Sequence, residues 1–534
     1  MSKIKSLGIM IDCSRDGVYT LETLKDYLTL LSKMGYTYAQ LYLEDVYELD
    51  NEPYFGYLRG RYSKSELKEI DEFSKTVNIE LVPCIQTLAH LGGITRWQEY
   101  KPYTDIDNIL LAGDDRTYAL IDKMFKACSE CFTSRRINIG MDEAHMVGLG
   151  KYLDKNGYQN RFDILIKHLN RVNDIAVKYG FKPMMWSDMF YRLVSNGEYY
   201  DPNATFTQEI INSVPENIDL IYWDYYSWNK SRFQNMLKSH KQFRNKVLFA
   251  GAAWAWTGFT PHNRFSIGSV KSALDACLDE GVEDVMLTVW GDDGAECSLY
   301  SSLSTVFCFA EYSRGNFDDE LISKKFNDLF GVPIETFIDL DNPNVNDNPK
   351  GLFSASKYMF YSDPFLGIYD KSVDESFDKK FEKVKIQLEN HSKTAPYPYI
   401  FKTLSSLCAV LEIKYALGVR TRKVYKSGNA DELQKLIDDY AKLESRLYEF
   451  YDNFRYQWEK ERKLNGFEKQ DIRIGGLIHR VKNCREILQE YALGIRQEIP
   501  VLDEEILTFT KSTPEKEMLG TSQWHLISMI KPFF

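Results

Sequence analysis

The sequence has no apolar stretch long enough for a membrane-spanning helix. Near the N-terminus only residues 7–11 form an apolar run before Asp12, which is shorter than the core of a secretory signal peptide. The nine cysteines are odd in number and scattered along 534 residues, which is typical of reduced thiols and not of a disulfide framework. We therefore expect a cytoplasmic protein with no membrane partner.

Clusters of basic residues and metal-ligand spacings are also missing. The formal net charge is −11, and no Lys/Arg-rich run offers a stripe for nucleic-acid phosphates. Only eight histidines occur, and neither His-x-His nor His-Glu-x-x-His is present. Cys128 and Cys131 form a lone Cys-x-x-Cys, for which core packing is favoured over zinc binding. The sequence thus predicts no nucleic-acid partner, no metal ion and no other cofactor.

What the first 300 residues do contain is an alternation of short apolar runs with amphipathic stretches. Eight apolar runs predict parallel strands buried on both faces, over residues 7–14, 38–45, 79–86, 137–143, 183–188, 218–225, 247–254 and 284–292. Helical patterns separate them, for example over residues 20–34, 63–76, 116–131 and 161–179. Eight strand–helix units close a barrel, and no Gly-x-Gly-x-x-Gly follows the first strand. The pattern favours a (β/α)8 TIM barrel over an open dinucleotide-binding sheet.

The rhythm changes after about residue 315. A loop-rich stretch over 339–348 is followed by long helical patterns over residues 375–391, 399–426, 430–463 and 469–493. Leu433, Ile437 and Tyr440 recur at helical spacing on one face. We expect a catalytic barrel over residues 1–315, and a loop-rich connection with an all-α C-terminal domain over 316–534. The sequence leaves open whether that domain forms a homodimer interface or shields one flank of the barrel.

Polar and aromatic residues gather where the predicted strands end, and active sites of βα-barrels lie at those ends. Taken singly, an aspartate after a strand more often caps a helix and a tryptophan more often fills the core. Together, carboxylates and indoles suit a sugar, which has a rim of hydroxyls and an apolar C–H face. The set comprises Arg15, Glu44, Asp45, Gln86, His90, Asp142, Glu143, Trp186, Asp188, Asp224, Tyr225, Trp254, Trp256, Trp290 and Asp292.

Several of these segments resemble the motifs of glycoside hydrolase family 20, the β-N-acetylhexosaminidases. Residues 138–143, Asn-Ile-Gly-Met-Asp-Glu, are similar to the family's His-x-Gly-Gly-Asp-Glu. Four further pieces follow in family order: Asp12-x-Ser14-Arg15, Gln86-Thr87-Leu88-Ala89-His90, Trp186-Ser187-Asp188 and Trp290-Gly291-Asp292. The resemblance covers the predicted barrel.

The chain also departs from the family pattern. Asn138 and Met141 replace a histidine and a glycine, and Asp292 is one methylene shorter than the usual glutamate. No Tyr-x-Asp stands near the seventh strand, so Tyr225 is taken as the missing tyrosine. The first strand starts too early for the α/β domain that often precedes the barrel, so an intracellular branch of the family is expected.

The resemblance implies exo-acting, retaining hydrolysis of terminal β-linked GlcNAc or GalNAc, with the substrate's own 2-acetamido oxygen attacking C1. Glu143 would protonate the leaving oxygen and then activate water. A water-poor site and the neighbouring Asp142 would raise its pKa for that task. Asp142 would accept the acetamido N–H, and Tyr225 would donate to the acetamido oxygen.

The other candidates would bind the sugar. Arg15 and Asp292 would hold hydroxyls, and Asp224 is a further substrate-binding candidate. His90 would either join the network near Asp142 or be a structural histidine. Trp186, Trp254 and Trp290 would enclose the ring and the acetamido methyl.

Two other functions remain open. One is a metal-dependent hydrolase or sugar isomerase on the same fold, for which His145 beside Asp142 and Glu143 is the nearest ligand cluster. The other is a sugar-binding barrel without turnover.

Overall fold

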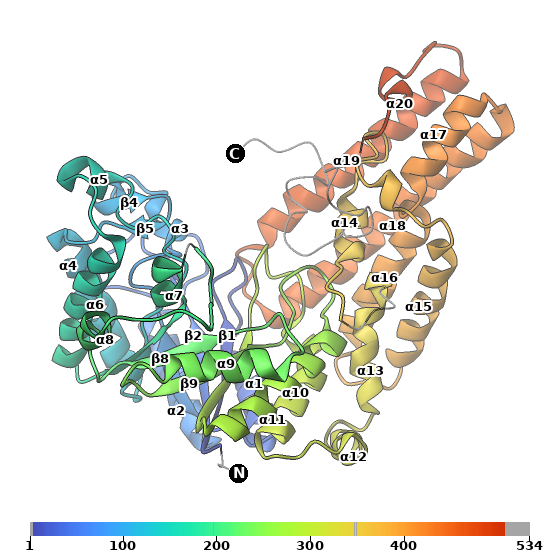
Figure 1. The fold of residues 1–534 in the computed structure, drawn as a ribbon. Helices are drawn as coiled ribbons and strands as arrows, with labels where there is room; N and C mark the ends of the chain where they lie inside the picture. The colour runs from blue at the N-terminus through green and yellow to red at the C-terminus, as the bar shows by residue number, and fades with distance from the viewer. Residues whose placement is uncertain (1–3, 196, 346–347, 349, 508–534) are drawn as a thin grey trace. The chain divides into compact units, whose positions relative to one another are not determined.

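The computed structural model describes residues 4–195, 197–345, 348 and 350–507, and the chain divides into two compact units. The first unit comprises Met1–Ala253, Ser266–Gly291 and Thr305–Asp318, and the second comprises Trp254–Phe265, Asp292–Ser304 and Asp319–Phe534. Figure 1 colours the chain by residue number, from blue at the N-terminus to red at the C-terminus. Among the described residues, no helix is both long enough and apolar enough to cross a membrane.

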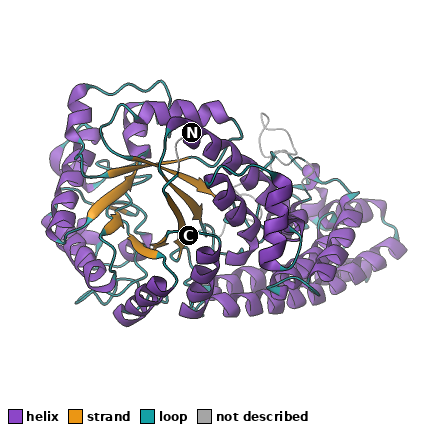
Figure 2. Ribbon diagram, turned by 90° about the horizontal axis from the view of Figure 1, so that it is seen from below, coloured by secondary structure: helices purple, strands orange, loops and turns teal. Residues whose placement is uncertain are grey.

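Eight parallel strands close into a barrel in the first unit, with helices around them (Figure 2). In spatial order, β1 is followed by β2, β3, β6, β7, β8, β9 and β10, and β10 pairs with β1 again. The strands are β1 Ser6–Asp12, β2 Tyr38–Tyr42, β3 Glu80–Cys84, β6 Arg136–Asn138, β7 Lys182–Trp186, β8 Asp219–Trp223, β9 Val247–Ala252 and β10 Asp284–Val289. Each overlaps one predicted strand, so the predicted (β/α)8 barrel is confirmed.

Helices follow the strands, and the longer ones bury an apolar face, for example α1, α4 and α6. Helix α2 shows how sequence sets such a boundary, because Ser63 and Glu66 form a reciprocal capping box at its start. Cys128 and Cys131 are buried in α4, as expected for core packing. The helices of this part of the chain are α1 Leu21–Lys33, α2 Lys64–Thr76, α3 Gly92–Thr95, α4 Asp115–Cys131, α5 Lys151–Asn156, α6 Arg161–Lys178, α7 Asp188–Val194, α8 Gln208–Ser213, α9 Lys230–His240, α10 Asn263–Glu280 and α11 Leu303–Ser313.

Two local features differ from the predicted pattern. A short antiparallel hairpin, β4 Thr104–Ile106 and β5 Ile109–Leu110, lies between β3 and α4. Strand β6 ends at Asn138, well before the predicted end at residue 143. The chain cannot continue as a strand there because Gly140, Met141 and Glu143 all have positive φ.

The second unit is all-α. Helix α15 packs on α16, α16 on α18, and α18 on α19. Tyr440, Leu443, Leu447 and Phe450 form a buried face of α18, as their spacing predicted. The single helix predicted over 399–426 is instead two helices, divided at residues 415–416. The helices are α12 Asp319–Phe330, α13 Ile334–Ile338, α14 Ala355–Tyr361, α15 Phe377–His391, α16 Pro398–Lys414, α17 Leu417–Ser427, α18 Ala430–Glu461, α19 Phe467–Ala492 and α20 Pro500–Asp503.

Candidate active site

The turn after β6 brings two adjacent carboxylates to one side of the chain. Adjacent residues of a strand point to opposite faces, but here the positive φ values of Met141 and Glu143 break that alternation. Gly140 also has a positive φ, and a Cβ at this position would lie 2.0 Å from the side-chain oxygen of Gln86. As a result, Asp142 Oδ2 and Glu143 Oε2 lie 3.2 and 3.6 Å from the same nitrogen, His90 Nε2.

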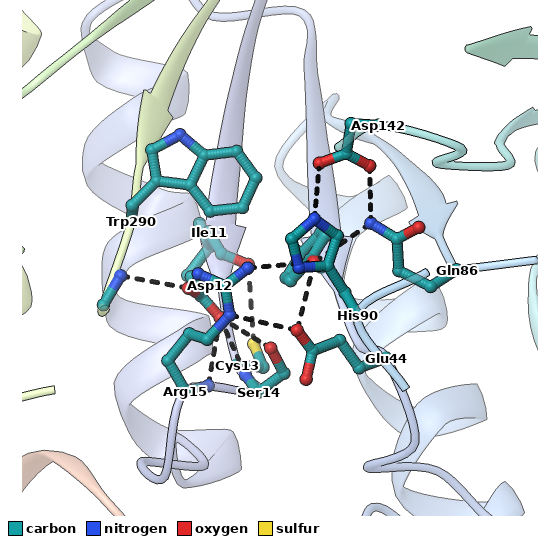
Figure 3. Close-up of polar contacts among 12 residues, drawn as sticks. Ile11, Asp12, Cys13, Ser14, Arg15, Glu44, Gln86, His90, Asp142 and Trp290 are labelled. Atoms are coloured by element: carbon teal, nitrogen blue, oxygen red, sulfur yellow. Dashed lines mark hydrogen bonds and ion pairs between the residues drawn. The ribbon is translucent and has the colours of Figure 1, made fainter. Parts of the chain in front are cut away.

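Asp142 is held in its ionised form by its neighbours (Figure 3). Gln86 Nε2 donates to Asp142 Oδ1 at 2.7 Å. Burial alone would raise the pKa of Asp142, but the positive charge of His90 and the contacts from His90 and Gln86 lower it below its ordinary value. Conversely, burial would lower the pKa of His90, and the charge of Asp142 raises it above the ordinary value. The pairing thus favours the ionised form of Asp142 and the protonated form of His90.

Glu143 is fixed from two directions, by Asp188 at the start of α7 and by Tyr199 in the loop between α7 and α8. Its backbone N–H donates to Asp188 Oδ2 at 3.0 Å, and Tyr199 OH donates to its Oε1 at 2.8 Å. The Tyr199 hydroxyl also lies 3.2 Å from His145 Nε2. His145 therefore contacts Tyr199, and in the part of the chain that the structure describes no group of three His, Cys, Asp or Glu is placed to hold a metal ion.

Asp188 is a fully buried carboxyl beneath this turn. Its Oδ1 accepts from Trp223 Nε1 at 3.3 Å. Burial, together with the negative charges of Asp142 and Glu143, raises the pKa of Asp188 to about 8. At neutral pH the carboxyl is therefore protonated, and it supports the Glu143 backbone without adding a further negative charge.

This protonation predicts a pH-dependent stability that Asp188→Asn removes. The unfolded chain loses the Asp188 proton near the ordinary pKa of about 4, whereas the folded chain keeps it up to about pH 8. Stability from this group is full below pH 4 and declines as the pH rises to about 8. The wild-type free energy of unfolding, minus that of Asp188→Asn, should fall by up to about 1.4 kcal/mol per pH unit in this window. Urea unfolding of both proteins at pH 5 and pH 8 measures it, and a constant difference would contradict the assignment.

Arg15 lies across the barrel mouth from this turn and is paired with Glu44. Arg15 Nε lies 3.0 Å from Glu44 Oε1, and its Nη2 donates to Tyr42 OH at 3.2 Å. The guanidinium carbon lies 5.3 Å from the centre of the Trp290 ring. Figure 3 shows that Arg15, Glu44, His90 and Asp142 lie close together at the strand ends. The pair presents both hydrogen-bond donors and acceptors, as sugar hydroxyls require.

Aromatic side chains line the same mouth. Trp186 is buried, with its ring centre 6.0 Å from that of Trp290. Trp290 Nε1 donates to Tyr225 OH at 3.2 Å, and the Tyr225 ring stacks on Trp223 at 5.1 Å. The structure therefore brings together Arg15, His90, Asp142, Glu143, Trp186, Tyr225 and Trp290 from the predicted set.

Three predicted residues are placed differently. Asp224 is buried, its Oδ2 pairs with Arg232 Nε at 2.7 Å, and its Oδ1 accepts from the Tyr226 backbone, so its carboxylate serves its own loop and α9. Trp254 and Asp292 belong to the second unit, where Trp254 stacks on Trp256 with ring centres 4.1 Å apart. Their contacts with a sugar stay predictions.

Sequence reasoning missed Tyr199 and left Glu44 without a role. Tyr199 lies in the loop between α7 and α8 and not at a strand end, so no pattern marked it. Glu44 did stand at a strand end, and its partner Arg15 was a candidate, but their pairing depends on tertiary structure.

Two models of known protein families match the sequence, one in each unit. Residues 8–240 match the catalytic domain of glycosyl hydrolase family 20, and residues 335–521 match the glycoside hydrolase 20C C-terminal domain. Hexosaminidase D of Homo sapiens is 23% identical over 309 residues, which are 52% of this chain and 61% of that protein. Hexosaminidase D of Bos taurus is 23% identical over 188 residues, 32% of this chain and 51% of that one. The chain thus spans between half and two thirds of these relatives.

Among solved structures, a β-N-acetylhexosaminidase of Bacteroides fragilis is 19% identical, with a TM-score of 0.46 over 61% of this chain and 70% of that one. A β-N-acetylglucosaminidase of Vibrio harveyi in complex with N-acetylglucosamine is 15% identical, with a TM-score of 0.45 over 64% of this chain and 58% of that one. The two family models match in chain order and together span most of the sequence. The chain belongs to glycoside hydrolase family 20.

Proposed function

We propose that the chain is an exo-acting β-N-acetylhexosaminidase that removes terminal β-linked GlcNAc or GalNAc from oligosaccharides with retention of configuration. In this proposal the 2-acetamido oxygen of the substrate attacks C1 and forms an oxazolinium ion. The observation that carries the proposal is the turn after β6, which directs an ionised, His90-paired Asp142 and the half-buried Glu143 to one side.

The two carboxyl groups suit two different tasks. Asp142 is buried and ionised, so it would accept the acetamido N–H and stabilise the positive charge that develops on the acetamido group. Glu143 is more accessible and is oriented by the Tyr199 hydroxyl, so it would give its proton to the glycosidic oxygen and then take one from water.

The remaining side chains would select the sugar. The Arg15–Glu44 pair would bind hydroxyls, and Trp186, Tyr225 and Trp290 would enclose the acetamido group. The Tyr225 hydroxyl accepts from Trp290 Nε1 at this mouth and would donate to the acetamido oxygen.

Rates on nitrophenyl β-GlcNAc, β-GalNAc and β-glucose, measured with and without excess chelator, test this function. We expect cleavage of one or both N-acetyl sugars, little cleavage of the glucoside, and no effect of the chelator. Equal cleavage of all three would contradict the proposal. Activity that disappears with chelator and returns with metal would indicate a metal-dependent hydrolase, and binding without turnover would indicate a sugar-binding barrel.

A further inference from the structure

A cavity of about 580 Å³ in the first unit, with His145 in its lining, has no role in the proposed reaction. His145, Arg161 and Arg192 supply its polar lining, together with Tyr158 and Asn160. His145 connects it to the proposed acid, because the Tyr199 hydroxyl lies 3.2 Å from His145 Nε2 and donates to Glu143 Oε1. The cavity is therefore two hydrogen bonds away from the Glu143 carboxyl group.

Two guanidinium groups face this cavity without a carboxylate partner. Neither Arg161 nor Arg192 has an Asp or Glu oxygen within ion-pair distance in the described ranges, although the chain carries a net charge of −11. Arg161 donates to the backbone carbonyls of His145 and Val147, which accounts for part of its donors. The Arg192 guanidinium makes no hydrogen bond or ion pair with any residue that the structure describes, and its carbon lies 4.8 Å from the centre of the Tyr199 ring. Its N–H donors are free to bind a ligand.

The electrostatic field around the two arginines favours a bound anion. Burial and the charge of Arg192 lower the pKa of Arg161, and the same two causes lower the pKa of His145. Helix α6, which is 18 residues long, begins at Arg161, so its positive end adds to the field. A bound oxyanion would relieve the repulsion between the guanidinium groups and accept their N–H donors in a forked geometry.

The position of the cavity determines which part of a substrate can reach it. In the proposed function, on which this inference rests, Glu143 protonates the glycosidic oxygen, so the leaving part of the substrate lies on the Glu143 side. Arg15 and Glu44 would hold the terminal sugar, and Glu143 stands on the side of His145 and Tyr199. We propose that this cavity binds an oxyanion substituent, a sulfate, phosphate or carboxylate, carried by the leaving part of the substrate.

Matched substrates test this selectivity. Aryl β-GlcNAc glycosides that carry a meta sulfonate, phosphate, carboxylate or neutral carboxamide place the group one ring away from the glycosidic oxygen. We expect kcat/KM of the wild type to be about tenfold higher for the anionic members than for the carboxamide. Arg192→Gln should bring that ratio close to one. The ratio is the readout because a disturbance of Tyr199 would slow all members alike.

Arg171→Gln is the matched control, because Arg171 is also on α6 but pairs with Asp115 on the surface. This variant should keep the preference. If the wild type shows no preference for the anionic members, or if Arg192→Gln retains it, the inference is wrong while cleavage of the carboxamide member leaves the proposed function standing.

Binding of inorganic sulfate, followed by calorimetry on the resting protein, separates the two proposals. We expect millimolar binding to the wild type and to Arg171→Gln, and its loss in Arg192→Gln. Sulfate binding without cleavage of any glycoside would overturn both the function and the assignment of the anion to a substrate. Absence of sulfate binding would contradict an oxyanion site.

Discussion

Glu143→Gln should lower kcat by about 10²- to 10⁴-fold on a disaccharide substrate, because the amide cannot transfer a proton to the leaving oxygen. Glutamine keeps the shape of the side chain and can still contact Tyr199 through its amide oxygen. Substrate binding should therefore survive, which a titration with the intact disaccharide measures. A lower kcat with unchanged substrate binding would show that proton transfer is lost, whereas weaker binding as well would show that the site is distorted.

The leaving group gives this experiment its internal control. A nitrophenolate leaves with little protonation, so Glu143→Gln should lose less rate on a nitrophenyl glycoside than on a disaccharide. Glu209→Gln makes the same substitution on the exposed helix α8 and should behave as wild type. A Glu143→Gln protein that retains most of its rate on the disaccharide would show that Glu143 is not the acid.

Asp142→Asn should lower kcat by about 10²- to 10³-fold, because a neutral amide cannot stabilise the positive charge that forms on the acetamido group. The substitution should also change His90. Its pKa is raised by the charge of Asp142, so removing that charge should move the imidazole titration to lower pH. Steady-state kinetics measure the first effect and NMR of the histidine ring protons measures the second.

Asp154→Asn, on the exposed face of α5, is the control for the loss of one aspartate. Two outcomes would argue against the orienting role of Asp142. One is a normal kcat for Asp142→Asn, and the other is a His90 titration that does not move.

The barrel could be predicted from the sequence because buried parallel strands leave a local signal, a short apolar run. The turn that makes the site could not. Gly140 is a glycine and so hints at a positive φ, but Met141 and Glu143 adopt the same region without any such hint. Tertiary contacts hold them there, namely Gln86 with the Met141 N–H and Asp188 with the Glu143 N–H.

Strand-end position identified candidates but could not say what each would contact. Arg15 and Asp224 both follow strands and both pair with an opposite charge. Arg15 pairs with Glu44 at the mouth of the barrel, whereas Asp224 pairs with Arg232 on the following helix. Tyr199 shows the converse, because a residue far from any strand end reaches Glu143 through the fold of its loop.

The central claim is that the acetamido oxygen of the substrate is the nucleophile. Aryl β-GlcNAc glycosides whose N-acyl methyl carries none, one, two or three fluorines test it directly, because each fluorine makes that oxygen a poorer nucleophile. We expect kcat to fall steeply and in order along the series. A kcat that is independent of fluorination would contradict the account and would instead assign the attack on C1 to a carboxylate of the protein.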